Sequence, residues 1–130
     1  MDEKDEDYNY ASILTSIKKL LGVHPSNTHF DPEIIMDINA VFLDLSQLGV
    51  NSDEDFFIND KSTLWNEYYK EGKLLNAIVL YTYLSVKLVF DPPTSSSAIE
   101  SINRRINKLE SRINYEVDKP QNNLEVKPYE

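Results

Sequence analysis

The stretch that decides the fold is "LLNAIVLYTYLSVKLVFDPPTSSSAIESI", residues 74–102. Its first seventeen residues, 74–90, are almost all apolar, and the run ends at Asp91-Pro92-Pro93. A helix that is apolar on all sides is buried on most of them, so we expect residues 74–90 to form the central helix of the fold. Proline has no backbone N–H to donate, so the proline pair ends that helix. The polar residues inside the run are Asn76, Thr82, Ser85 and Lys87.

A membrane span and a β-strand are the alternatives for this run. A transmembrane helix needs about twenty apolar residues with orienting charged loops, whereas this run is shorter and carries Lys87 near its end. Its β-branched residues favour a strand, but seventeen residues is long for one. We therefore predict a helix enclosed by its own chain or by adjacent subunits, and no membrane.

The segment after the prolines is patterned as a different kind of helix. Residues 94–97 all carry a hydroxyl group, and Ser97 and Glu100 have the spacing of a capping box. The apolar residues that follow step by three and four, which predicts a narrow coiled-coil-like seam on a helix that is otherwise in water or against a neighbouring subunit. The seam consists of Ile99, Ile102, Ile106, Leu109 and Ile113.

Three further helices are expected before the central one. An amphipathic stripe over residues 10–21 is ended by Gly22, where a left-handed conformation costs glycine least. A second stripe covers residues 31–48, and Asp31 is its candidate N-cap. A short helix is expected at residues 62–70.

The fold class that follows is all-α: a small helical bundle of four main helices plus one short helix, with an extended C-terminal tail. We divide the chain into an acidic N-terminal segment at residues 1–8, a helical bundle domain at 9–116 and the extended tail at 117–130. Within the domain, residues 50–61 form an acidic loop in which Phe56–Ile58 is a possible short strand.

Composition limits the function. The chain has 130 residues, a formal net charge of −9 and no cysteine. A nucleic-acid-binding protein usually presents a basic patch, so the acidic balance argues against binding phosphate backbones. The absence of cysteine excludes disulfides, thiolate catalysis and zinc–thiolate sites, and suits a reducing compartment. The acidic N-terminus lacks the basic-then-apolar order of a signal peptide.

Catalytic and metal-binding patterns are not found. His24 and His29 lie in a loop near Asp31 without metal-ligand spacing. The acidic stretch "NSDEDFFIND" lacks the glycine and glutamate that a calcium loop requires. Neither a glycine-rich phosphate loop nor a serine nucleophile motif occurs, so we expect no enzyme activity, no cofactor and no metal.

Several features favour protein contacts. The aromatic residues Trp65, Tyr68 and Tyr69 fill either the core or an interface, since Tyr and Trp suit both. The stretch 31–60 holds eight acidic residues and no Lys or Arg. That charge either keeps the surface soluble or lines the lumen of a ring. The alternating pattern at the end of the tail favours strand addition to a partner.

Four segments together resemble a known family. They are "YASILTSIKKLLG", "FDPEIIMDINAVFLDLSQLGV", "FFINDKSTLW" and "YLSVKLVFDPPTSSSAIESINRRINKLESRIN". Their order resembles the head–tail connector (adaptor) proteins of tailed bacteriophages with long tails, especially those of Gram-positive hosts. The resemblance covers residues 10–114, and its most specific part is the apolar helix that runs into "DPPTSSS".

The resemblance implies a structural subunit of the virion that is assembled in the host cytoplasm. Such subunits form a homo-oligomer, usually a dodecameric ring, under the portal protein. The ring extends the DNA channel, lets DNA pass through its lumen without specific binding, and docks a head-completion (stopper) protein or the tail. In such proteins a C-terminal extension contacts the portal, and the loop between the second and third helices faces the tail side.

Carried onto this sequence, the resemblance and the patterns above give three sets of candidate residues. The portal-binding candidates are Leu124, Val126 and Tyr129. The candidates that face the stopper or tail are Asp53, Glu54, Asp55, Phe56 and Phe57. The subunit-interface candidates are Trp65, Tyr68, Tyr69, Arg104, Arg105 and Arg112.

Two alternatives remain open at this point. The first alternative to a connector is a small acidic helical regulatory protein of the antitoxin type with a basic partner. The second is an enzyme that uses a pair of its many carboxylates. Mixing with purified portal separates the connector from the regulatory protein, and a turnover assay addresses the enzyme.

Overall fold

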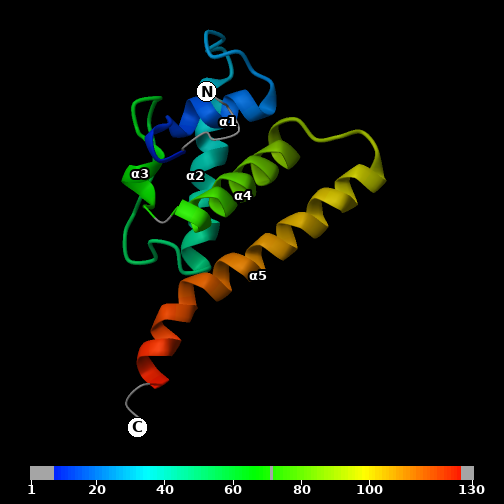
Figure 1. Ribbon diagram of the computed structural model, residues 1–130. Helices are drawn as coiled ribbons and strands as arrows, with labels where there is room; N and C mark the ends of the chain where they lie inside the picture. Colours follow the sequence, from blue (N-terminus) through cyan, green and yellow to red (C-terminus); the bar gives the residue numbers. More distant parts are fainter. Residues whose placement is uncertain (1–7, 71, 127–130) are drawn as a thin grey trace, which may run out of the picture.

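Helix α4, Gly72–Phe90, lies at the centre of the molecule and is contacted by α1, α2 and α5 (Figure 1). The structure is a computed structural model that describes residues 8–70 and 72–126. Within these residues the fold is all-helical and has no β-strand, which confirms the predicted fold class. The remaining elements are the 3₁₀ turn η2 (Tyr8–Tyr10), α1 (Ile13–Leu21), α2 (Asp31–Gln47), α3 (Trp65–Tyr68) and α5 (Ser96–Val126).

The apolar run forms a buried helix, as the sequence predicts. Eight side chains of α4 are buried, and Ile78 and Val86 are fully enclosed. Among the described residues α4 is the one helix long and apolar enough to cross a membrane, a test that the core helix of a soluble protein also passes. Lys87 does not contradict burial, because its ammonium group reaches the end of the helix and binds Asp91 there, at 3.7 Å from the carboxylate.

Helix α5 runs along the outside of the bundle and contacts it along one side (Figure 1). Ile113 is the one fully buried residue of its described seam, and Asn114 donates a hydrogen bond to the Leu48 carbonyl at 3.0 Å. On α4, the Tyr81 hydroxyl donates to the Glu110 carboxylate at 3.0 Å. These contacts hold α5 to the C-terminal end of α2 and to the middle of α4.

Helix α5 extends beyond the end that the sequence pattern suggests. The pattern places that end at Glu116, whereas the helix continues to Val126. The half-buried side chain of Val117 packs against Gly49, which favours the continuation past Glu116. Val117 lies four residues after Ile113, a step that the spacing of the seam allows. The division into a domain at 9–116 and a tail at 117–130 stays a prediction.

The structure corrects the predicted cap of α2 and selects Ser95 among the hydroxyl residues 94–97 as the cap of α5. Asp31 is the first residue of α2 and makes no capping hydrogen bond, because its carboxylate binds Lys18 instead. Helix α5 is capped by Ser95, whose hydroxyl accepts a hydrogen bond from the Ala98 N–H at 3.1 Å, and not by Ser97. Ser95 takes this role because the helix begins at Ser96, two residues earlier than the Ser97–Glu100 spacing suggests.

The aromatic side chains of α2 and α3 meet in the core. The Trp65 indole N–H donates to the buried Ser16 hydroxyl of α1 at 2.8 Å, which satisfies the one polar group of the ring. The Tyr68 ring stacks on Phe42 of α2 with centroids 4.3 Å apart. A single antiparallel bridge between Ser12 and Leu64 joins the start of α1 to the start of α3.

Candidate interaction surfaces

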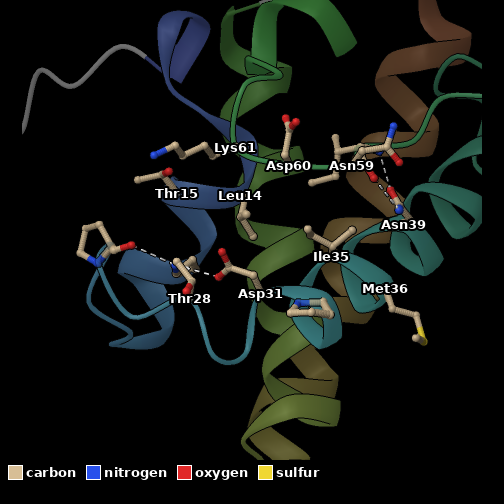
Figure 2. A pocket seen from close by; sticks show the side chains of 14 residues that line it. Leu14, Thr15, Thr28, Asp31, Ile35, Met36, Asn39, Asn59, Asp60 and Lys61 are labelled. Carbon is tan, nitrogen blue, oxygen red and sulfur yellow. Dashed lines mark hydrogen bonds and ion pairs between the residues drawn. The ribbon is translucent and has the colours of Figure 1, made fainter.

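A polar pocket between α1, α2 and the segment around Asp60 contains a buried ion pair (Figure 2). The Lys18 ammonium lies 2.8 Å from the Asp31 carboxylate and donates to the Pro25 carbonyl at 3.2 Å. Lys18 is 3% exposed, so the pair is shielded from solvent on one side. Removing one partner of such a pair leaves an uncompensated buried charge. The pair therefore fixes the loop between α1 and α2 and offers no free group for chemistry.

Hydrogen bonds of the Asn39 side chain attach the end of the acidic loop to α2. Asn39 donates to the Ile58 carbonyl at 3.0 Å and accepts from the Ile58 N–H at 2.8 Å, and Figure 2 shows Asn39 pointing toward this segment. The short strand that was possible at Phe56–Ile58 is not formed, because the backbone of Ile58 pairs with the Asn39 amide and not with another strand. Ile58 itself is buried, so the loop has a fixed end.

The two histidines lie in the loop before α2. The His24 ring accepts a hydrogen bond from the Ser26 N–H at 3.1 Å, and the His29 ring packs edge-on against Phe30. Among the described residues there is no group of three or more His, Cys, Asp and Glu side chains placed to hold a metal ion. Asp60 has a lowered pKa, because Ser62 donates side-chain and backbone hydrogen bonds to it, which is a local turn.

The tail-side candidates surround an apolar groove on the outer side of α2. Phe57 is 60% exposed, and Asp53, Glu54 and Asp55 are exposed beside it. Phe56 is half-buried and contacts the Phe42 and Tyr68 rings, so it anchors the loop to the core. The groove also contains Met36 and Leu43 of α2, each 69% exposed.

The interface candidates fall into two groups. Trp65 and Tyr68 are 0% and 4% exposed, so both belong to the core. Their rings are enclosed by their own chain and present no surface to a neighbouring subunit. Tyr69 is half-buried. Arg104, Arg105 and Arg112 are exposed on α5. Burial in the chain is the physical reason for removing Trp65 and Tyr68 from the interface.

The portal-binding candidates lie at the end of the chain. Tyr129 lies outside the described residues, and the structure describes the helical backbone at Leu124 and Val126 but not their side chains. Their role stays a prediction. The sequence analysis also missed Met36 and Leu43, although they occupy the same side of α2, seven residues apart and outside its buried stripe.

Comparison with known proteins identifies the family to which the chain belongs. The model of the family described as "Phage connector protein" matches residues 13–120, which contain all of the helices from α1 to α4 and most of α5. The chain belongs to this family. No curated protein sequence and no solved structure matches the connector chain.

Family membership agrees with the geometry of the connector chain. In the pocket between α1 and α2, Lys18 and Asp31 are held by their ion pair, and Asp60 accepts the hydrogen bonds of the Ser62 turn. What the chain offers instead are exposed apolar and charged side chains on α2, on the acidic loop and on α5. Such a distribution is suited to contacts with other phage head and tail proteins.

Proposed function

We propose that this connector protein is a structural subunit that assembles into a dodecameric ring between the portal and the tail. The observation that carries the proposal is the family match over residues 13–120, which covers almost the whole folded chain. The function is binding, and the ring extends the DNA channel. Contacts with the portal on one side and with a stopper or tail protein on the other give the ring its place in the virion.

The acidic loop is proposed as the tail-side contact. Phe57 supplies an exposed aromatic anchor, which is the kind of side chain that contributes most in protein interfaces. Asn39 holds the end of this loop at Ile58, so Phe57 is presented from a fixed base. The carboxylates of Asp53, Glu54 and Asp55 surround it and favour a basic partner surface.

The portal contact is proposed for the C-terminal residues Leu124, Val126 and Tyr129. This assignment rests on the family resemblance and on the long α5, which extends beyond the other helices (Figure 1). The lumen is proposed to be acidic, so that the phosphates of passing DNA are repelled and do not bind the wall.

Mixing the purified chain with the portal of the same phage tests the proposal. We expect the full-length chain to co-sediment with portal rings, and a variant that lacks residues 119–130 to lose this binding while its helical content per residue stays the same. A full-length chain that never co-sediments with portal, together with a deletion that leaves particle assembly unchanged, would remove the connector function. If the chain instead captured a basic host protein, the regulatory alternative would replace it.

The lumen is tested by charge reversal at Asp53, Glu54 and Asp55. Replacing all three by Lys is expected to impair genome passage or retention, because the added cations attract phosphate. Binding of the same variant to the tail-side partner is measured separately, because these carboxylates also belong to the proposed tail-side contact. Unchanged DNA ejection and phage titre in this variant would contradict an acidic lumen at these residues without affecting the connector function.

A further inference from the structure

Two exposed surfaces of the chain carry opposite charges. The acidic face lies on α2 and consists of Glu33, Met36, Asp37, Leu43 and Asp44. The basic groove lies along the contact of α4 and α5 and consists of Lys73, Leu80, Arg105, Arg112 and Tyr115. The ion pairs Lys18–Asp31 and Lys87–Asp91 lie outside both surfaces.

The acidic face is a row of carboxylates beside a row of apolar side chains. Glu33, Asp37 and Asp44 follow one another at intervals of four and seven residues, which places them along one side of a helix over about 16 Å. Met36 and Leu43 lie next to this row and are each 69% exposed. One oxygen of the Asp37 carboxylate is buried without a hydrogen-bond partner. The face thus combines uncompensated negative charge with uncovered apolar surface.

The basic groove has the complementary composition. Arg112 and Lys73 line it together with Leu80, Tyr115 and one carboxylate, Glu116, and Tyr115 is 61% exposed. Arg105 precedes Arg112 by seven residues, so it continues the same edge of α5 by two turns. The groove thus combines positive charge with apolar and aromatic surface.

The two surfaces lie on different helices and share no residue. The Glu110 carboxylate of α5 accepts a hydrogen bond from Tyr81 of α4, so Glu110 faces α4. Arg112 follows Glu110 by two residues, which turns its side chain by about 200° around the helix. The basic edge of α5 therefore lies on the other flank of this helix from Glu110.

We propose that the acidic face of one subunit docks into the basic groove of the next copy of the same chain. This inference rests on the proposed ring and identifies the surfaces that build it. A contact between two different surfaces of the same subunit is heterologous, and it generates a ring when the rotation closes. Each contact brings three carboxylates to three cationic side chains and covers Met36 and Leu43 with Leu80 and Tyr115.

Charge reversal of each surface tests the contact. The first variant carries Glu33→Lys and Asp44→Lys, and the second carries Arg105→Glu and Arg112→Glu. Each alone places like charges across the contact, so we expect the concentration for half-assembly to rise at least about 100-fold, in sedimentation velocity with portal present. Mixed in equal amounts, the two variants restore opposite charges in every contact of an alternating ring, so assembly returns.

Matched controls change charge elsewhere by the same amount. Glu100→Lys with Asp118→Lys, and Lys19→Glu with Lys70→Glu, leave both surfaces intact and are expected to assemble like the wild-type chain. All four variants are exposed substitutions and should melt as the wild-type monomer does. Assembly of the wild-type chain should weaken between 0.1 M and 1 M salt, where the Debye length falls from about 10 Å to about 3 Å.

The outcomes separate this contact from the ring itself. Rings formed equally well by the wild-type chain and by both reversed variants overturn the contact and leave the connector function standing. Variants that form rings but lose portal binding also overturn the contact, since the two surfaces then bind the portal. The contact is likewise overturned if a mixture of the two folded variants does not assemble. A wild-type chain that forms no ring on the portal overturns both.

Discussion

Helices α4 and α5 are both long, but they are held in opposite ways. Helix α4 has 19 residues, of which eight are buried under three other helices, whereas α5 has 31 residues and its described part contains one buried side chain, Ile113. An apolar helix enclosed on all sides contributes to the stability of its own subunit and has little surface left for others. A helix that packs by one seam leaves most of its sides to partners. The contrast assigns α4 to the core of the subunit and leaves α5 with exposed sides for the proposed contacts between subunits.

The largest expected effect is at the centre of α4. Ile78→Ala removes three carbon atoms from a fully buried position and should lower the free energy of unfolding by roughly 2–5 kcal/mol, because the enclosed site cannot collapse around the cavity. Urea denaturation followed by circular dichroism measures the change. The control is Val89→Ala on the same helix, which is 67% exposed and should change stability by less than about 0.5 kcal/mol. Equal effects of the two substitutions would contradict the central burial of α4.

A smaller effect is expected where α5 meets the end of α2. Gly49 has a φ of +105°, which side-chain-bearing residues rarely adopt, and a Cβ there would lie 2.8 Å from the Val117 side chain. Gly49→Ala should therefore destabilise the fold by about 1–3 kcal/mol. Thermal unfolding is the measurement, and Gly72→Ala, whose added Cβ meets no atom within 4 Å, is the control. If Gly49→Ala were neutral, α5 would not pack against this turn.

A smaller loss of stability is expected when the hydrogen bond between α4 and α5 is removed. Tyr81→Phe removes the hydroxyl that donates to Glu110 and should cost about 1 kcal/mol, because the rest of the ring stays buried. Hydrogen exchange should rise around Glu110 on α5 more than along α4, since α4 keeps its other contacts. Tyr83→Phe on the same helix is the comparison variant. Faster exchange along α4 instead would indicate that α5 holds α4 in place.

The smallest effect is expected on the acidic face of α2. Partial burial and then the neighbouring Glu33 carboxylate raise the pKa of Asp37 above its ordinary value of 3.8. The folded state therefore binds this proton more tightly than the unfolded chain, so stability falls as pH rises from about 3.8 through the raised pKa. In the monomer, Asp37→Asn should be slightly more stable than wild type at neutral pH, and the difference should disappear below about pH 3.8. Melting temperatures across this range measure it, and a wild-type chain that gains stability relative to Asp37→Asn with rising pH would reverse the sign.

Much of this architecture follows from hydrophobic periodicity. The apolar run of α4 and the proline pair after it are local signals, and both predict what the structure shows. The partner of a charged side chain is not local. Asp31 has the ordinary position of an N-cap, and only the approach of α1 brings Lys18 to it. In the same way, Val117 extends α5 beyond its seam because Gly49 of another element lies against it.

The interaction surfaces were predictable only in part. The exposed arginines of α5 follow from the narrow seam, and the acidic loop follows from its composition. Aromatic residues suit cores and interfaces alike, so Trp65 and Tyr68 were assigned only when the structure showed them enclosed. Met36 and Leu43 lie off the buried stripe of α2, and their exposure depends on how the acidic loop crosses the helix.

Cryo-electron microscopy of the chain bound to its portal tests the central claim most directly. The account predicts a closed ring coaxial with the portal, in which α4 is enclosed within each subunit and the basic edge of α5 contacts α2 of the next. Portal particles that carry no ring at saturating concentrations of the chain would contradict it.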